Sequence, residues 1–385
     1  MSDPLVYIIA GEPSGDLLAA RLMAALRDLT GGAVRFAGIG GEAMREQGID
    51  SLFPQADLAV MGFAEVVPRI PRILRRLRET LEDIEARSPS LIVTVDSWGF
   101  TGRVAKALKK KGSPIPRLHY VAPMVWAWKE KRARTLAGRV DRLLCLLPNE
   151  PAYFERHGLK AVHVGHPVLE RLGERGDGEG FRRRHGIAQD APLLCVLPGS
   201  RHSETSRLLP VFAETAHRLL DRIPALRIVV PSVETVSDSV RRAVAGWRVP
   251  AIVVDADGKW DAFAASDAAL AASGTVALEL AVARVPMVIA YRVAPLTAML
   301  ARRLLTIGYV CLLNLLAGRP VVPELLQEAC EPARLIEVLL PLLRDGPERR
   351  RQFDGCAEAL ELLGVGGESP SRRAAREALS MIPGN

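Results

Sequence analysis

The loop at residues 10–16, AGEPSGD, combines two glycines with two carboxylates. It lies between an apolar run at residues 5–9 and an amphipathic segment, so we expect it to join a strand to a helix. Glycines allow close backbone approach to a ligand, but the loop has no lysine to meet a phosphate. Because carboxylates accept hydrogen bonds from hydroxyl groups, Glu12 and Asp16 point to a sugar. The alternative is that Ser14 or Asp16 only caps the helix.

A second carboxylate, Asp96, follows the apolar run at residues 91–95. At the end of a buried strand it is a candidate general base for a hydroxyl nucleophile, a role typically worth about 10²–10⁴ in rate. It could instead cap the next helix. His119, Trp126 and Trp128 lie close together further along the chain. Tryptophan faces stack on sugars and cover acyl chains, although both rings could equally belong to the core.

Two loops in the second half of the chain have the composition of anion-binding loops. Each follows an apolar run and opens a helix, whose first N–H groups favour a negative charge. Glu279 lies one helical turn into the second of these helices, where its carboxylate could bridge two ribose hydroxyls. The pair of loops predicts a nucleotide site. Its residues are Gly199, Ser200 and Arg201 in the first loop and Ser273, Gly274 and Thr275 in the second.

All these candidates follow apolar runs, so the order of secondary-structure elements must position them. Strand-like runs alternate with helical patterns in both halves of the chain, which predicts βαβ units and parallel sheets. We therefore expect an α/β protein with two doubly wound, Rossmann-like domains facing across a cleft that holds the site. The runs are residues 5–9, 34–39, 91–96, 117–122, 143–148 and 161–165, then 193–199, 227–231, 251–255, 268–273 and 285–291.

Domain boundaries are expected where the periodic spacing of apolar residues, typical of helices and strands, is interrupted. The polar segment at residues 170–192 is rich in glycine and charge, so the first domain is predicted to span residues 1–185. The second would span residues 186–345 and bind the nucleotide. Residues 346–385 are predicted to form C-terminal helices that could pack back on the first domain.

Composition narrows the class of partner. The chain of 385 residues has a net charge of +7, which suits an anionic membrane surface, a phosphorylated substrate or a nucleic acid. No RNA- or DNA-binding motif is recognisable, so nucleic acid is not expected. Five scattered cysteines fit a reducing cytoplasm, and the uncharged run at residues 304–318 is too short for a typical membrane span. The N-terminus lacks the basic region that begins a signal peptide, so a cytoplasmic location is expected.

Residues 66–84 have a basic amphipathic pattern. Such a helix can lie on an anionic membrane, or it can pack on a sheet with its charged face in water. Arginines flank the apolar stripe at positions 69, 72, 75, 76 and 78. The stripe consists of Val66, Ile70, Ile73, Leu74, Leu77, Leu81 and Ile84.

Two further motifs are weak. The string GIGGEA at residues 38–43 matches a dinucleotide fingerprint, but it follows the second expected strand instead of the first. The string DAD at residues 255–257 resembles the metal motif of some glycosyltransferases, but it precedes a helical pattern and is interpreted as a turn and cap. We expect no metal and no cofactor.

Several strings, in matching order from about residue 6 to about residue 335, resemble the lipid-A-disaccharide synthase family of GT-B glycosyltransferases. They are AGEPSGD, AVMGFAEVVPRI, HYVAPMVWAWKEKR, VGHP, LPGSR, ASGTVALE and NLLAGRPVVPELLQ. The resemblance implies transfer from UDP-2,3-diacylglucosamine to 2,3-diacylglucosamine 1-phosphate. A β-1,6 link would form with inversion, and UDP would leave.

The resemblance also implies residue roles. Asp96 would be catalytic, the two anion-binding loops would hold the diphosphate, Glu279 would hold the ribose, and Asn314 would line the UDP side. Glu324 and Gln327 are weaker candidates. Acceptor contacts would come from Glu12, Ser14, Gly15, His119 and Trp126, and membrane contacts from Val66, Val67, Ile70, Ile73, Leu74 and Leu77.

Three positions depart from the usual family pattern. Trp98 stands for a proline, Thr101 for an asparagine, and Leu313 for the proline that commonly precedes Asn314. These changes leave Asp96 in place but put neighbouring acceptor contacts in doubt.

The resemblance further implies a peripheral location on the inner face of the inner membrane, and it leaves room for a homodimer. A UDP-N-acetylglucosamine 2-epimerase would share the architecture without an acyl-binding surface. An oxidoreductase binding through GIGGEA is a third hypothesis.

Overall fold

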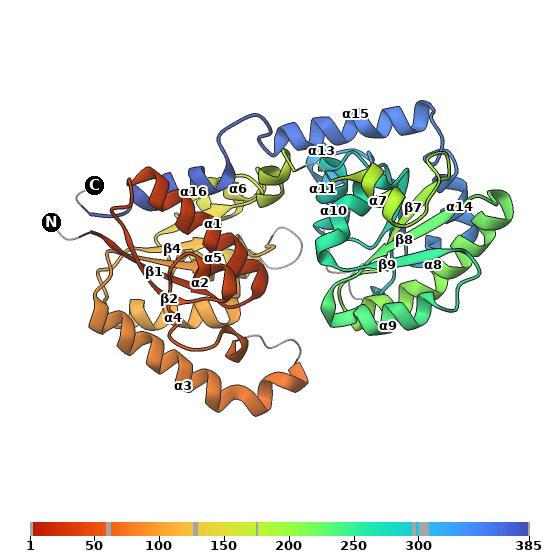
Figure 1. Ribbon diagram of the computed structural model, residues 1–385. Helices are drawn as coiled ribbons and strands as arrows, with labels where there is room; N and C mark the ends of the chain where they lie inside the picture. The colour runs from red at the N-terminus through yellow and green to blue at the C-terminus, as the bar shows by residue number, and fades with distance from the viewer. Residues whose placement is uncertain are drawn as a thin grey trace. The chain divides into compact units, whose positions relative to one another are not determined.

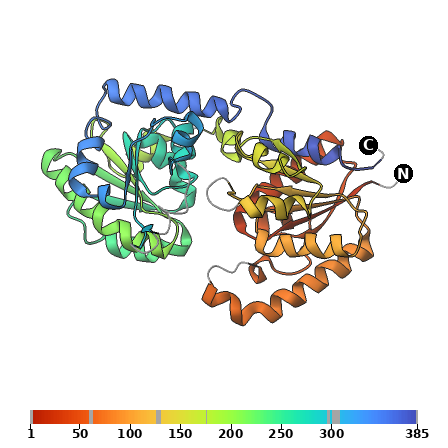
Figure 2. The ribbon, with the colours of Figure 1, turned by 180° about the vertical axis from the view of Figure 1, so that it is seen from behind.

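The computed structural model describes residues 3–58, 63–125, 130–174, 176–294, 298–299 and 308–383, with backbone only at 63–69 and 130. The chain folds into two compact units, shown from opposite sides in Figures 1 and 2. Unit 1 comprises Met1–Pro167 and Gly367–Asn385, and unit 2 comprises Val168–Gly366.

Unit 1 is built on a parallel sheet of six strands in the order β2-β1-β3-β4-β5-β6. The chain runs from β1 to β2 on one side and then to β3 on the other, so the order reverses between β1 and β3. Each strand coincides with an expected apolar run. The strands are β1 (Leu5–Ala10), β2 (Arg35–Ile39), β3 (Leu91–Val95), β4 (Arg117–Tyr120), β5 (Arg142–Cys145) and β6 (Lys160–His163).

Helices cover both faces of this sheet, with α1 and α16 on one face and α3 and α4 on the other (Figure 1). Because both faces are buried, the strands are apolar throughout instead of alternating with polar residues. The helices are α1 (Pro13–Leu29), α2 (Glu42–Glu46), α3 (Phe63–Arg87), α4 (Trp98–Lys110), α5 (Glu130–Ala137), α6 (Pro151–Glu155) and α16 (Pro370–Leu379), with the 3-10 turn η1 (Gln55–Asp57).

Helix α3 contains the basic amphipathic segment, and its apolar stripe is divided between core and solvent. Ile73 and Ile84 are buried against the sheet, and Leu77 and Leu81 pack against the same cluster. The prediction that Ile73 contacts a membrane is therefore wrong, because the core of unit 1 covers this side chain. Leu77 is only partly buried, and its membrane contact stays a prediction.

Two members of the predicted membrane contact remain accessible on α3. Ile70 and Leu74 have 44% and 56% of their surfaces exposed. The side chains of Val66 and Val67 lie outside the described residues. In the part of the chain that the structure describes, no helix is both long and apolar enough to cross a membrane.

Unit 2 contains a second parallel sheet, in the order β12-β11-β10-β7-β8-β9, which reverses between β7 and β10. Five strands match expected runs. The sixth, β12, was not predicted, because it has only three residues and all are half-buried. The strands are β7 (Leu193–Leu197), β8 (Arg227–Pro231), β9 (Ala251–Val254), β10 (Ala268–Ala271), β11 (Met287–Tyr291) and β12 (Glu324–Leu326).

The helices of unit 2 also form two layers (Figure 2). Helices α8, α9 and α14 pack on one face of the sheet through a single apolar cluster. The helices are α7 (Gly178–Arg184), α8 (His202–Arg222), α9 (Glu234–Val244), α10 (Lys259–Ala265), α11 (Val276–Val282), α13 (Leu312–Ala317), α14 (Pro332–Leu339) and α15 (Pro347–Leu362), with the 3-10 turns η3 (Ala256–Gly258) and η4 (Gln327–Ala329).

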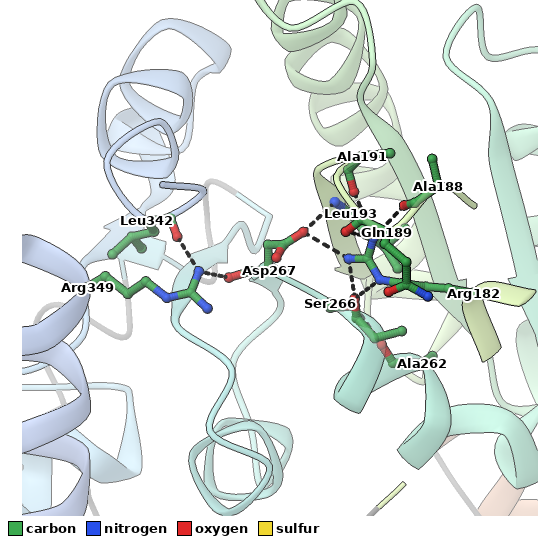
Figure 3. Close-up of polar contacts among 11 residues, drawn as sticks. Arg182, Ala188, Gln189, Ala191, Leu193, Ala262, Ser266, Asp267, Leu342 and Arg349 are labelled. Atoms are coloured by element: carbon green, nitrogen blue, oxygen red, sulfur yellow. Dashed lines mark hydrogen bonds and ion pairs between the residues drawn. The ribbon is translucent and has the colours of Figure 1, made fainter. Parts of the chain in front are cut away.

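The polar segment at residues 170–192, where a domain boundary was expected, is anchored in unit 2 by the buried Arg182 (Figure 3). Arg182 of α7 donates to the Ala265 carbonyl at 2.6 and 3.0 Å and to an Asp267 carboxylate oxygen at 3.1 Å. The same oxygen accepts the Leu193 N–H, and Arg349 of α15 donates to the Asp267 carbonyl. The units consequently divide after Pro167, whereas this boundary was predicted after residue 185.

The C-terminal segment is shared between the units. Helix α15 lies in unit 2, where Gln352 donates to and accepts from the Met287 backbone. Helix α16 lies in unit 1, where its alanines join the apolar cluster around α1. Arg142 of β5 fixes α16 by donating to the Glu377 carbonyl and carboxylate at 2.8 Å.

Candidate active site

The carboxyl ends of β1 and β3 lie side by side in unit 1, at the point where the strand order reverses. Ligands bind at such switch points in open α/β sheets. Glu12 follows β1, and Ser97 follows β3 and donates from its hydroxyl to a Glu12 carboxylate oxygen at 3.2 Å. A Cβ at Gly11 would lie 2.8 Å from that hydroxyl oxygen, so only glycine allows the two loops to approach this closely.

Asp96 and Ser97 both adopt the left-handed backbone conformation, with φ of 49° and 45°. Side chains other than glycine rarely adopt it, and such strain gathers at functional sites. Thr101 holds the turn, because its hydroxyl donates to the Asp96 carbonyl at 2.8 Å and to the Ser97 carbonyl at 3.1 Å. Thr101, which departs from the family pattern, therefore supports Asp96 through its backbone.

The Asp96 carboxylate is half-buried, and in the described part of the chain no side chain pairs with it. Burial raises its pKa above the usual range for aspartate, and the Ser97 N–H opposes this effect. A carboxylate with a raised pKa and no cationic partner is a stronger base than an exposed aspartate. This is the protonation behaviour that a general base requires.

Asp16 has a different role from the one predicted for it. It is buried, and its carboxylate accepts the N–H groups of Gly41 at 2.7 Å, Ala43 at 3.0 Å and Met44 at 3.2 Å. It thus caps α2 from the first turn of α1 and is not available to a sugar. The dinucleotide interpretation of residues 38–43 fails for the same reason, because Asp16 occupies the N–H groups that a pyrophosphate would need.

His119 lies in the middle of β4 with 1% of its surface exposed. Its Nδ1 lies 2.8 Å from the Thr94 hydroxyl, and its ring packs edge-on against Trp98 at a centroid distance of 4.8 Å. Burial lowers its pKa to about 3, so the ring is neutral at physiological pH. Because its ring is buried, His119 cannot contact an acceptor sugar in this conformation. It instead contributes to the packing around the paired strands β3 and β4.

The remaining predicted acceptor residues have varied positions. Ser14 is exposed in the first turn of α1, and its side chain does not cap that helix. Gly15 is buried, and a Cβ there would lie 3.5 Å from the Val95 carbonyl oxygen. Trp126 lies outside the described residues.

The neutral His119 predicts a pH effect on stability. Below pH 6.5 the unfolded chain gains a proton at this position, whereas the folded chain does not until about pH 3. Stability therefore falls as the pH drops, by about 2 kcal/mol from this residue at pH 5. We expect thermal melts of His119→Gln to lose less between pH 7 and pH 5 than wild type. His185→Gln, at an exposed position, is the control, and identical slopes for wild type and His119→Gln would contradict the assignment.

The switch point of unit 2 brings together the two predicted anion-binding loops, one after β7 and one after β10. Gly199 has φ of 106°, and a Cβ there would lie 2.5 Å from the Glu204 carboxylate. Glu204 is buried and accepts the Ser200 N–H at 3.1 Å, Arg201 Nη1 at 3.1 Å and the Tyr291 hydroxyl at 3.0 Å. Glu204 was not among the predicted site residues, although a glutamate in the first turn of a helix is a capping signal.

Arg201 lies at the N-terminus of α8 with 60% of its side chain exposed, so its guanidinium can meet an anion. Glu204 orients it from the protein side. In the second loop Gly274 and Thr275 are exposed, and Ser273 is half-buried. This arrangement offers a permanent cation and helix N–H groups at one edge of the sheet, which suits a diphosphate.

Glu279 and Asn314 have partners within unit 2. Both carboxylate oxygens of Glu279 accept from the Lys259 ammonium at 2.9 Å, and about a quarter of each side chain is exposed. Asn314 is buried, and its amide donates to Val322 and Glu324 and accepts two backbone N–H groups, from Val321 and Val322. Since its hydrogen-bonding capacity is used, Asn314 shapes the loop and does not contact a ligand directly.

Comparison with known proteins decides the family. The family model described as lipid-A-disaccharide synthetase matches residues 6–378. The lipid-A-disaccharide synthase of Paramagnetospirillum magneticum is 57% identical over 380 residues, covering 98% of this chain and 97% of that protein. The chain belongs to the lipid-A-disaccharide synthase family. It is accordingly a glycosyltransferase of lipid A biosynthesis.

Solved structures support the fold of this family member. The glycotransferase of kitacinnamycin aligns with a TM-score of 0.64 at 16% identity, over 99% of both chains. The UDP-N-acetylglucosamine 2-epimerase of Neisseria meningitidis bound to UDP-N-acetylglucosamine gives 0.64 at 12% identity, over 99% of this chain and 100% of that one. Because the sequence identities are this low, the structural similarity establishes only the fold, which is GT-B-like with two Rossmann-like domains. That fold was predicted and is confirmed.

Proposed function

We propose that the protein transfers a 2,3-diacylglucosaminyl group from its UDP derivative to the 6-hydroxyl of 2,3-diacylglucosamine 1-phosphate, with inversion. Family membership supports this choice of substrates. The single observation that carries the mechanism is Asp96, a half-buried carboxylate with a raised pKa at the switch point of unit 1, which pairs with no side chain among the residues that the structure describes.

In the proposed step Asp96 accepts the proton of the acceptor 6-hydroxyl. The oxygen attacks C1 of the donor sugar, the C1–O bond to the diphosphate breaks, and UDP leaves with the bonding electrons. Attack opposite an α-linked leaving group gives the β-1,6 product. One displacement needs one base, and it needs electrostatic stabilisation of the leaving diphosphate.

We assign the UDP portion of the donor to the switch point of unit 2. Arg201 and the N–H groups at the start of α8 would neutralise the diphosphate, aided by the loop at Ser273 to Thr275. Glu279 would accept the ribose hydroxyls, and Lys259 keeps its carboxylate in place. Because guanidinium and N–H groups suffice for this charge, the proposal requires no metal.

We further propose that the N-terminal half of α3 meets the anionic inner face of the inner membrane. Residues 63–78 contain five arginines and one glutamate, whereas residues 79–87 contain one arginine and four acidic residues. The exposed Ile70 and Leu74 lie in the basic half. Apolar insertion and attraction to anionic lipid would therefore act at the same end of the helix.

The double substitution of Ile70 and Leu74 by serine tests this surface. Each buried aliphatic side chain is worth about 1.5–3 kcal/mol, so we expect vesicle affinity to fall at least about tenfold in flotation with anionic vesicles. Leu362→Ser, at an equally exposed leucine of α15 in unit 2, is the matched control. If the double variant bound vesicles as tightly as Leu362→Ser does, the exposed face of α3 would be excluded as the membrane contact.

UDP release by the purified protein in detergent with EDTA tests the function. The donor is supplied with and without 2,3-diacylglucosamine 1-phosphate. We expect release that depends on the acceptor, together with a β-linked disaccharide 1-phosphate identified by NMR. Conversion of UDP-N-acetylglucosamine to its 2-epimer, with no acceptor-dependent release, would replace the proposal by the epimerase function.

A further inference from the structure

The 3-10 turn η1 contacts both the loop that carries Glu12 and the basic helix α3. The Gln55 amide donates to the Ala10 carbonyl at 3.0 Å and to the Glu12 carbonyl at 3.1 Å. Two residues later, Asp57 accepts Arg76 Nε at 2.8 Å and Arg76 Nη2 at 2.5 Å through one oxygen. One short turn thus links α3 to the end of β1.

The hydrogen bonds of Gln55 fix the backbone that presents the Glu12 carboxylate. That carboxylate accepts the Ser97 hydroxyl, and Ser97 directly follows Asp96. If the Gln55 amide were lost, two carbonyls at the end of β1 would lose a donor. The Glu12 loop could then move relative to Asp96, although Gln55 does not touch the reacting atoms.

The contact between Asp57 and Arg76 is largely shielded from solvent and lies against an aromatic ring. Fewer than one fifth of either side chain is exposed, and the Arg76 guanidinium lies 4.5 Å from the centre of the Phe53 ring. Arg76 also donates to Glu79 at 2.7 Å within α3, a contact that does not involve η1. A partly buried guanidinium with a carboxylate and an aromatic partner transmits position better than an exposed ion pair does.

The two halves of α3 are attached differently. In the C-terminal half, Asp83 accepts the Tyr7 hydroxyl of β1 at 2.8 Å, so the sheet holds this half directly. Arg76 lies between that attachment and the exposed Ile70 and Leu74. The N-terminal half packs on the sheet through Ile73. It reaches η1 through Arg76 and through Arg72, which lies 3.5 Å from the other Asp57 oxygen. A force on the exposed Ile70 and Leu74 would therefore be felt at η1 through Asp57.

We propose that Gln55 and Asp57 are positioning residues of the acceptor site. Gln55 holds the loop of Glu12, and Asp57 couples that loop to α3, so that contact of α3 with an anionic lipid surface orders the acceptor site. This inference deepens the proposed function and rests on it, because it concerns the same acceptor.

Steady-state kinetics of Gln55→Met test the first part. This variant keeps the side-chain length but removes the amide donor. We expect kcat/KM for the acceptor to fall about ten- to hundredfold, because two hydrogen bonds are lost. The donor KM and the Kd for UDP, measured by calorimetry, should stay within about twofold of wild type. Unchanged acceptor kinetics, or equal losses for donor and acceptor with a lower Tm, would overturn the role of Gln55.

Asp57→Asn tests the coupling, with the acceptor presented either in anionic phosphatidylglycerol vesicles or in neutral detergent micelles. We expect wild type to be more active with vesicles, and Asp57→Asn to lose about fivefold there while changing less than twofold in micelles. Asp57→Glu should recover most of the loss. Glu79→Gln removes the other carboxylate partner of Arg76 and is the matched control.

The outcomes separate the inference from the function on which it rests. A vesicle-to-micelle ratio for Asp57→Asn equal to that for Glu79→Gln would overturn the coupling. Absence of acceptor-dependent UDP release from wild type in both presentations would overturn the proposed function instead. If Gln55→Met does not fold, Asp57→Asn still decides the connection between η1 and the acceptor site.

Discussion

Replacement of Asp96 by asparagine is expected to lower kcat by about 10²–10⁴, because the acceptor hydroxyl loses its base. Asparagine is the informative choice, since it tolerates the left-handed backbone, with φ of 49°, that Asp96 adopts. Alanine would add backbone strain to the chemical loss. Initial rates of UDP release under saturating donor and acceptor measure the effect.

The pH profile distinguishes a base from a positioning group at this residue. Only the ionised carboxylate can accept the proton, so wild-type kcat/KM for the acceptor should rise with pH through the pKa of Asp96. Burial places that rise above the range of an ordinary aspartate. In Asp96→Asn the residual kcat/KM should not show this rise with pH, which forms the acidic limb of the wild-type profile. A variant that keeps the limb and only raises the acceptor KM would identify Asp96 as a positioning group.

Asp50→Asn is the matched control for this experiment. It makes the same chemical change at an exposed position after α2 in the same unit. Its rate should equal that of wild type within about twofold. Full turnover by Asp96→Asn would exclude both roles and would move the search for a base to other residues of unit 1.

Replacement of Arg201 by methionine is expected to weaken binding and turnover of the UDP-sugar donor, and to leave acceptor binding unchanged. A charge-assisted hydrogen bond contributes about 1.5–3 kcal/mol, so UDP should bind about ten- to hundredfold more weakly. The developing charge on the leaving diphosphate adds to this, and kcat/KM for the donor should fall about 10²–10³. Arg201→Lys should recover part of the loss, because an ammonium replaces the charge but not the planar fork.

The loop around Arg201 should survive this substitution. Glu204 keeps its hydrogen bonds from the Ser200 N–H and the Tyr291 hydroxyl, which do not depend on the arginine. Arg207→Met, at an exposed position on the same helix, is the control. Calorimetric Kd values for UDP that are equal in the two variants would remove Arg201 from the proposed diphosphate site. The acceptor KM should not change in either.

Local pattern was enough to predict the fold class and eleven strands. A strand covered on both faces is a short, continuous apolar run whatever its neighbours are, and loops that follow such runs are readable as candidate sites. Asp96, Arg201 and the loop at Ser273 became candidate site residues in this way, and their roles stay predictions. The order of family strings then predicted the family, which the comparisons confirm.

Contacts between residues distant in sequence decided the rest. A carboxylate accepts a sugar hydroxyl and a backbone N–H equally well, so only the fold shows that Asp16 caps α2. An apolar stripe does not record what covers it, so only the packed sheet shows that Ile73 is buried while Leu74 is exposed. The same holds for Asn314, whose amide is used by a loop seven to ten residues further on. Side-chain chemistry is a property of one residue, but its use depends on distances that tertiary structure alone sets.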